Sequence, residues 1–391
     1  MKTLIKNALL LDVAHDYEAA DILVDGEKIA AVGPHLPPEG ADVIDLGGQT
    51  VMPAFLDAHV HTKPASGPFA DEDEILSAFV YNGVSAVKDL GILDDIPLEG
   101  YIQWLSQQDK PGKVRIATAG RYIDVDGGYG MGPFPGVKWG IEIVTPQEAV
   151  DAVLYQFRTG VNGIKIGIND GVMSPIKGQL SPEHIKAITS TAKTLGIWST
   201  AHVYTVADLR TLIANGIGEA AHTPHDAVID DVTIAAMVDN GIPMTTTIGN
   251  WAKNGPLPDH FPPSFASAQQ FLDVMLIQKE ITLKNLQKFY QAGGTISIGT
   301  DFMRSSTPYK DATIPVGELR QLRQDVGMTM TDAIRAGTVN AAASCGFTDE
   351  GAIRPGNRAN LIAFRGSLAD DFSQLLNLTF VMNRGAIIRR Q

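Results

Sequence analysis

The chain has 391 residues, of which 44% are hydrophobic and 19% are charged, with 39 glycines and 22 prolines. This composition is typical of a loop-rich globular protein, and it excludes disordered, collagen-like and coiled-coil chains. Acidic residues outnumber basic ones by 44 to 31, for a formal charge of −13. We therefore expect neither nucleic acid nor an anionic membrane as a partner. The single cysteine, Cys345, excludes an intramolecular disulfide framework and a four-cysteine zinc site.

The start of the chain gives no targeting signal. The basic, apolar stretch 1–11 is followed at once by Asp12, and no small-residue cleavage site is present. Nor does any stretch supply the roughly 20 uninterrupted apolar residues that a membrane span requires. We therefore expect a cytoplasmic protein.

Both ends of the chain are predicted to be rich in short strands. Three or four strands separated by glycine turns are expected within 4–53, and the same texture returns within 351–390. We expect 1–52 and 349–391 to form one small β-sandwich domain together.

The intervening residues alternate between apolar strands and segments of helical periodicity. The predicted strands span 51–61, 84–90, 114–119, 163–168, 197–203, 218–222, 242–248 and 295–301. The predicted helices span 71–82, 145–160, 181–195, 205–215, 228–240 and 265–292. This alternation predicts an α/β fold with a TIM-like (β/α)₈ barrel over 53–348. A doubly wound sheet is the alternative, but it would be favoured by a glycine-rich phosphate loop after the first strand, which the sequence lacks.

In barrel enzymes, catalytic groups lie at the carboxyl ends of the strands. His59 and His61 end the first predicted strand, and their spacing of two places both imidazoles on one face, where they could chelate a metal ion. Lys165 lies within an apolar strand, where an amine is costly unless it is paired, shifted in pKa or modified. The alternative for Lys165 is an amine that extends from the strand end to solvent.

Three further predicted strands end in residues that can bind metals, namely His202, His222 and Asp301. Each alone could be an ordinary polar residue at a strand end. Together with the two histidines and the lysine above, they predict a metal site in the mouth of the barrel. A structural zinc site is disfavoured, because its ligands usually include cysteine and lie close together in the sequence.

Several segments spread along essentially the whole chain carry a family resemblance. They are ADILVDGEKIAAVG, VIDLGGQTVMPAFLDAHVHT, GVSAVKDLG, NGIKI, IGTD and the closing stretch from Glu318 to Phe364. In these segments the chain resembles the amidohydrolase superfamily, in particular its imidazolonepropionase-like and prolidase-like branch. The resemblance implies a hydrolase that acts on carbon–nitrogen bonds.

The resemblance also implies a set of metal ligands. His59 and His61 would bind one divalent ion, and His202 and His222 would bind a second. Lys165, N6-carboxylated by CO₂, would bridge the two ions. Zinc is the expected metal, although histidine and carboxylate ligands also suit manganese, cobalt and iron.

Asp301 would contact the first ion, take a proton from the attacking water and return it to the leaving group. The implied activity is hydrolysis of an amide bond by a hydroxide that two metal ions activate. The substrate would be a small peptide-like, N-acyl or cyclic amide. We further expect a homo-oligomer, because relatives of this fold commonly assemble.

Two positions near the predicted ligands are ambiguous. His225 lies three residues beyond His222 and is the alternative ligand, but the strand count favours His222 and leaves His225 to line the pocket. Tyr204 shares a strand face with His202 and could bond the substrate or the oxyanion. Relatives in this branch often carry a histidine there instead, which leaves the role of Tyr204 open.

Two loop residues are further candidates for substrate binding. Tyr129, in the glycine-rich loop 127–135, would either line the pocket or pack within its own loop. Arg304 follows the last strand, where it could bind a substrate carboxylate or be a solvated loop charge.

Other functions fit the sequence less well. Superfamily deaminases carry a glutamate where this chain has Thr205, and they lack the bridging lysine. A non-catalytic scaffold would have lost ligands, and none of the expected ones is missing. Hydrolysis of lactones or organophosphate esters by the same binuclear site remains the alternative function.

Overall fold

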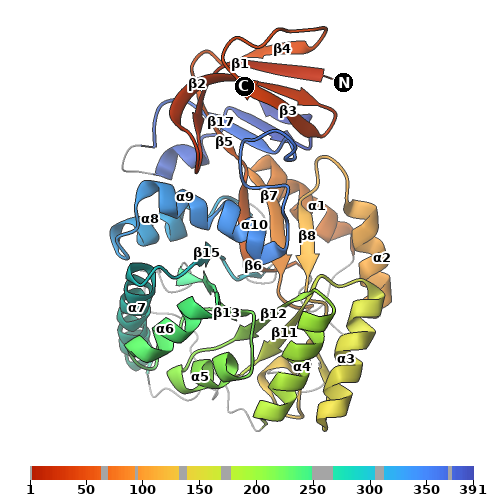
Figure 1. The fold of residues 1–391 in the computed structure, drawn as a ribbon, viewed down its shortest axis with the longest axis vertical. Helices are drawn as coiled ribbons and strands as arrows, with labels where there is room; N and C mark the ends of the chain where they lie inside the picture. Colours follow the sequence, from red (N-terminus) through yellow and green to blue (C-terminus); the bar gives the residue numbers. More distant parts are fainter. Residues whose placement is uncertain are drawn as a thin grey trace.

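The computed structural model describes residues 2–62, 69–92, 96–131, 139–168, 178–248, 267–303, 312–368 and 372–391. The fold is mixed α/β. A sheet that contains both termini lies at one end of the molecule, and parallel strands flanked by helices make up the rest (Figure 1).

Strands from both ends of the chain form one hydrogen-bonded sheet. Its strands are β1 (Lys2–Leu11), β2 (Asp16–Asp25), β3 (Lys28–Gly33), β4 (Asp42–Asp45), β5 (Thr50–Pro53), β17 (Leu361–Phe364), β18 (Phe380–Asn383) and β19 (Ala386–Arg390). β5 joins the two termini, because it pairs in parallel with β1 and antiparallel with β17. The strands predicted at both ends are present, and they pair in one sheet.

The terminal sheet has a branch at β1. Residues 3–6 of β1 pair with β4, whereas Leu9 and Leu10 pair with β5. Asn7, between these two stretches, has a left-handed backbone with φ 55°. Apolar residues of both terminal segments, such as Ile22 and Phe380, form a hydrophobic cluster of their own.

All eight parallel strands expected from the sequence are present. They are β6 (Phe55–His61), β7 (Val84–Asp89), β8 (Arg115–Thr118), β11 (Gly163–Gly167), β12 (Trp198–His202), β13 (Glu219–Ala221), β14 (Met244–Thr246) and β15 (Ile296–Ile298). β6, β7 and β8 form one sheet, with the short β16 (Phe302–Met303) at its edge, and β11 to β15 form another in chain order.

The two parallel sheets meet at seams where individual hydrogen bonds replace a strand ladder. At one seam, the amide of Asp301 donates to the carbonyl of His59 at 2.8 Å. At the other, the side chain of Asn162 accepts from the amide of Thr118 at 2.9 Å, while the amide of Asn162 donates to the carbonyl of Thr118. The described strands therefore do not form one continuous ladder, which a closed barrel would show.

Helices follow the strands and cover their outer side. They are α1 (Phe69–Tyr81), α2 (Leu98–Gln108), α3 (Pro146–Thr159), α4 (Pro182–Thr194), α5 (Val206–Ala214), α6 (Asp231–Asp239) and α7 (Ala268–Gln291). The closing helices α8 (Val316–Gln324), α9 (Met330–Ala336) and α10 (Val339–Cys345) lie between the parallel strands and the terminal sheet (Figure 1). None of the described helices is long and apolar enough to cross a membrane.

The presence or absence of an N-terminal capping residue explains which helices could be predicted from the sequence. α3 begins with a complete capping box between Thr145 and Glu148. α2, which was not predicted, follows Pro97 and has no side-chain cap, so it lacks this local start signal.

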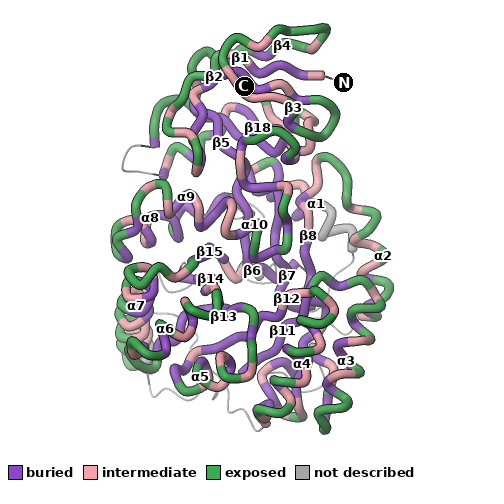
Figure 2. The backbone as a smooth tube through the Cα atoms, viewed as in Figure 1, coloured by how far each residue is buried: buried purple, intermediate pink, exposed green. Residues whose placement is uncertain are grey.

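The parallel strands lie in the interior of the protein. Every residue of β6, β7 and β11 is buried, and Figure 2 shows these strands buried where the surrounding helices are partly exposed. Polar side chains on these strands must therefore find partners inside the protein or bind something that enters it.

Candidate active site

The four histidines predicted as ligands meet at the carboxyl ends of the parallel strands. The ring centroid of His59 lies 5.5 Å from that of His61 and 4.7 Å from that of His222. The centroids of His222 and His202 are 4.5 Å apart. Residues separated by more than a hundred positions thus form one cluster, because the parallel strands end at the same edge.

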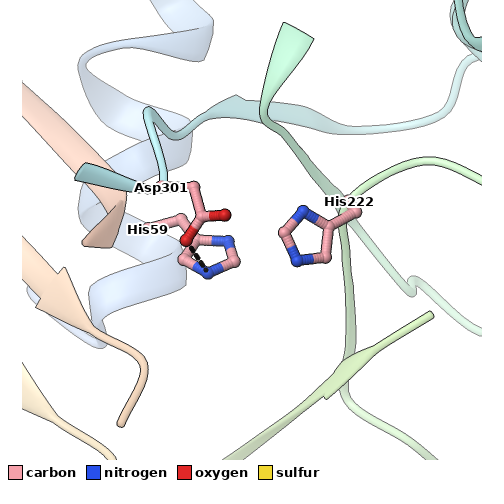
Figure 3. Close-up of side chains that lie close together, drawn as sticks. All are labelled: His59, His222 and Asp301. Carbon is pink, nitrogen blue, oxygen red and sulfur yellow. Dashed lines mark ion pairs between the residues drawn. The ribbon is translucent and has the colours of Figure 1, made fainter. Parts of the chain in front are cut away.

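Asp301 lies within this cluster. Its Oδ1 is 3.3 Å from Nε2 of His59 and 3.3 Å from Nε2 of His61. Asp301, His59 and His222 each offer a ligand atom, and these three atoms lie within 4.8 Å of one another (Figure 3). Imidazole nitrogens and a carboxylate oxygen at such distances form a ligand set suited to a divalent transition-metal ion.

Two residues of this group have a left-handed backbone. His222 has φ 69° and Asp301 has φ 51°, a conformation that costs about 1–3 kcal/mol for a residue other than glycine. His222 directly follows β13, and Asp301 lies between β15 and β16. Each amide donates to a neighbouring strand, His222 to the carbonyl of Thr245 and Asp301 to that of His59. The backbone thus turns where the strand ends and directs both side chains toward the other strand ends.

Hydrogen bonds orient two of the imidazole rings. Nδ1 of His61 lies 2.8 Å from the carbonyl oxygen of Gly91, and Nδ1 of His222 lies 2.8 Å from Oγ1 of Thr247. Because a carbonyl only accepts, Nδ1 of His61 must donate. If the ring is neutral, the lone pair on Nε2 then faces the carboxylate of Asp301. Two acceptors this close repel each other, so a proton or a metal ion must lie between Nε2 and the carboxylate.

Burial keeps three of the histidines neutral. It lowers the pKa of His59 and His202 well below the usual range, and that of His222 to about 3. Neutral imidazole is the form that binds metals. For His61, burial alone would lower the pKa, but the hydrogen bond and charge of Asp301 outweigh it and raise the pKa.

Asp301 is held as a carboxylate. Burial would raise its pKa, but the hydrogen bond from His61 and the nearby charges of His222 and His61 lower the pKa to about 2. The cluster therefore combines a carboxylate with neutral imidazoles.

Lys165 is fully buried on β11, and its Nζ has no hydrogen-bond partner among the residues that the structure describes. Burial lowers the pKa of its amine to about 7. Lys165 lies two residues before Gly167, which pairs with His202 at the end of β12. Its charge contributes to the lowered pKa values of His59 and His202. Since buried polar groups are nearly always hydrogen-bonded, an unpartnered amine at this position needs a functional explanation.

Aromatic side chains form a wall beside His202. The ring of Tyr129 stacks on that of His202, with centroids 3.8 Å apart and an interplanar angle of 19°. The ring of Tyr204 lies 4.3 Å from His202 and 4.4 Å from His225, whose Nδ1 is 3.2 Å from the carbonyl of Thr223. The structure thus places His222 in the three-ligand group and His225 farther out, against Tyr204.

The position of Tyr129 depends on residues that the sequence did not single out. Tyr129 begins the short 3₁₀ helix η1 (Tyr129–Met131), after β9 (Tyr122–Asp124). The carboxylate of Asp124 accepts from the amide of Gly130 at 2.8 Å. On the other side, a Cβ at Gly167 would lie 2.5 Å from Cδ1 of Tyr129. The ring therefore fits between its own turn and β11.

Another residue missed from the sequence is Asp89, which supports His61. Its carboxylate accepts from the amide of Gly91 at 3.0 Å and from the hydroxyls of Thr62 and Tyr101. These bonds fix the turn whose carbonyl orients His61. Asp89 ends β7, so the rule applied to the other strand ends could have found it. Arg304 lies outside the described residues.

Comparison with known proteins decides the family. The sequence model of the amidohydrolase family matches residues 50–389. The chain belongs to this family. The imidazolonepropionase of Deinococcus deserti is 20% identical over 371 residues, which cover 93% of this chain and 89% of that protein.

Solved structures of other proteins share the fold of this amidohydrolase. A prolidase in complex with N-methylphosphonate-L-proline has a TM-score of 0.82 at 22% identity and covers 100% of both chains. A Xaa-Pro dipeptidase with methionine bound in its active site has a TM-score of 0.82 at 24% identity and covers 99% of both. These likenesses show a shared fold. The family itself identifies the amidohydrolase as a hydrolase acting on carbon–nitrogen bonds.

Proposed function

We propose that this amidohydrolase cleaves the amide bond of a small peptide-like, N-acyl or cyclic amide with the help of metal ions at the carboxyl ends of its parallel strands. The observation that carries this proposal is the unpartnered, fully buried amine of Lys165 beside neutral histidines and a carboxylate. Among the structural neighbours, one is a Xaa-Pro dipeptidase, which makes X-Pro dipeptides the first substrates to assay.

The donor set fits divalent metal ions, with zinc as the expected identity. His59, His61 and Asp301 would hold one ion, and Asp301 would place its oxygen between the two imidazoles, 3.3 Å from each. His202 and His222 would hold a second. Because the three-ligand group itself combines His222 with His59 and Asp301, a single ion in that group is the alternative.

Lys165 would bridge the two ions after carboxylation. The neutral amine attacks the carbon of CO₂ and forms a nitrogen–carbon bond. The electrons of one carbon–oxygen π bond move to the oxygen, which becomes negatively charged. One proton leaves the nitrogen for solvent. The lowered pKa of Lys165, which burial brings to about 7, makes the neutral amine available. The product replaces an unpartnered donor with two anionic oxygens, which suit metal ions better than an ammonium does.

A bound divalent cation supplies Lewis acidity, which polarises the scissile carbonyl and makes water more acidic. The carboxylate of Asp301 accepts the proton of the attacking water and then donates it to the leaving nitrogen. Burial raises the pKa of Tyr204 well above its usual range, so its hydroxyl stays protonated and donates to the carbonyl oxygen of the substrate.

Three other residues are proposed to contact the substrate. His225 and Tyr129 flank Tyr204 and His202 and would line the pocket. Arg304 would bind a carboxylate group of the substrate. These assignments follow from proximity to the cluster and from charge.

We also propose a finer description of the fold. The eight parallel strands would close into a TIM-like barrel over 53–348, supported by the bonds that bridge both seams. Segments 1–52 and 349–391 would form a β-sandwich domain, supported by their separate hydrophobic cluster.

The first test is the metal content per chain, measured by mass spectrometry on protein purified without chelator and with bicarbonate present. About two ions per chain would support the binuclear site and justify a panel of X-Pro and other dipeptides, N-acyl amino acids, hydantoin-like rings and lactones. A single ion that persists after metal is supplied would overturn the binuclear proposal. Turnover of lactones or organophosphate esters without turnover of any amide would favour the alternative substrate class.

A further inference from the structure

One buried side chain bonds both sides of the seam between β6 and β15. In the part of the chain that the structure describes, no strand ladder joins these two strands. The carboxylate of Asp57, which is 0% exposed, spans the gap instead. Its Oδ1 accepts from the amides of His59 at 3.1 Å and Thr300 at 3.0 Å, and its Oδ2 accepts from Oγ1 of Thr300 at 2.5 Å.

The two ends of this bridge lie next to two candidate metal ligands. His59 donates its own amide to Asp57, and Asp301 directly follows Thr300. Thr300 is held through both its amide and its hydroxyl, and the amide of Asp301 donates to the carbonyl of His59. Together these bonds hold Asp301 in its left-handed backbone conformation, at φ 51°.

Close packing at the same seam leaves little room for movement. A Cβ at Gly299 would lie only 2.5 Å from Cβ of His59 and 3.0 Å from its amide nitrogen. The backbone before Thr300 therefore lies directly against His59. On the far side of Asp301, Phe302 and Met303 pair in parallel with Val60 and His61. On the near side, the Asp57–Thr300 bonds hold the backbone, so their loss would free Asp301 to shift relative to His59.

We propose that Asp57 is a positioning residue, which together with Thr300 clamps His59 and Asp301 at the separation that one metal ion requires. In the structure, Oδ1 of Asp301 lies 3.3 Å from Nε2 of His59, and the clamp acts together with the β16–β6 pairing to keep it there. This inference rests on the proposed metal site, but it concerns the geometry of the chain itself. Asp57 neither binds metal nor contacts the substrate in this scheme.

The competing explanation is purely structural, namely that Asp57 satisfies buried amides without any effect on the ligands. A matched bond on the neighbouring strand separates the two explanations. Oγ of Ser85, buried near the start of β7, donates to Oε2 of Glu350 at 3.1 Å. Ser85→Ala therefore removes a buried bond from hydroxyl to carboxylate far from the ligands.

The test measures Zn²⁺ affinity by competition with a chromophoric chelator. We expect Thr300→Val, which keeps the shape but loses the hydroxyl, to weaken Zn²⁺ binding by about 10- to 100-fold. Thr300→Ser should restore most of the affinity, and Ser85→Ala should leave it unchanged. Equal affinity in Thr300→Val and the wild type, or an equal loss in Ser85→Ala, would overturn the clamp.

A second measurement, amide hydrogen exchange on the metal-free proteins, separates the clamp from the proposed function. Thr300→Val and Asp57→Asn should accelerate exchange in peptides that contain His59 and Asp301, whereas Ser85→Ala should not. If the wild type binds neither zinc nor another divalent transition-metal ion, the proposed function fails, and the exchange result alone decides the clamp. Unchanged exchange in both clamp variants would overturn it.

Discussion

Two buried lysines on parallel strands differ in one decisive respect. Lys88 on β7 and Lys165 on β11 are both 0% exposed. Nζ of Lys88 donates to the carboxylate of Glu219 and to the hydroxyls of Thr200 at 3.0 Å and Ser344 at 3.1 Å. Nζ of Lys165 has no hydrogen-bond partner.

The comparison distinguishes a lysine with a structural role from one with a proposed functional role. The charge of Lys88 is neutralised and fully bonded by the chain, as a buried ion pair must be. Lys165 lies beside histidines that are also short of partners, since Nδ1 of His59 has none. The environment of Lys88 is complete without a ligand, whereas the environment of Lys165 requires one. Changes near Lys165 should therefore alter activity, and changes near Lys88 should alter stability.

The largest expected effect is on turnover by Asp301→Asn. The amide cannot accept the proton of the attacking water, so kcat should fall by about 10²- to 10⁴-fold. Steady-state kinetics on a substrate found in the panel would measure this, with thermal unfolding as the control for folding. A near-native kcat would refute the assigned proton transfer.

Lys88→Met should produce the largest loss of stability. It leaves the carboxylate of Glu219 buried without its partner, which should lower the free energy of unfolding by about 3–5 kcal/mol. Urea denaturation would measure the loss. The double variant Lys88→Met/Glu219→Met should recover most of it, because the buried charge is then removed as well. A fall in kcat of folded Lys88→Met that matched the effect of Asp301→Asn would contradict the proposed separation.

Gly167→Ala should have an intermediate effect. The new Cβ would lie 2.5 Å from Cδ1 of Tyr129, so the ring must move away from His202. Overpacking of this kind costs about 1–3 kcal/mol, and KM should rise.

Gly163→Ala is the control at the other end of the same strand, where the Cβ would meet the ring of Trp198 at 1.9 Å. That variant should lose stability without a change in KM. An equal rise in KM for both would mean that Tyr129 does not line the pocket.

In the metal-free protein, Lys165→Met should change the free energy of unfolding least, by less than about 1 kcal/mol, because it removes a buried amine that has no hydrogen bond to lose. Its metal content should fall below that of the wild type. Lys165→Ala should regain part of its activity when a short-chain carboxylate such as acetate is added. A destabilisation as large as that of Lys88→Met would show that the amine of Lys165 has a structural partner after all.

Local patterns were sufficient to predict most of the strands and helices. The eight parallel strands and the helices that begin with capping residues were visible because apolar runs and caps are properties of adjacent residues. α2 was missed because Pro97 precedes it without a side-chain cap. The strand ends also identified the residues that the structure brings into one cluster.

The tertiary structure decided what those residues have around them. In the sequence, Lys88 and Lys165 look alike, since each is a lysine within an apolar strand. They differ only because the partners of Lys88 lie 112 to 256 positions away in the chain. The clamp at Asp57 likewise joins residues 243 positions apart. Pairing over such distances depends on how the strands are arranged in space. The sequence by itself therefore determined which charged and polar side chains are present, and the fold determined which of them remain without a partner among the described residues.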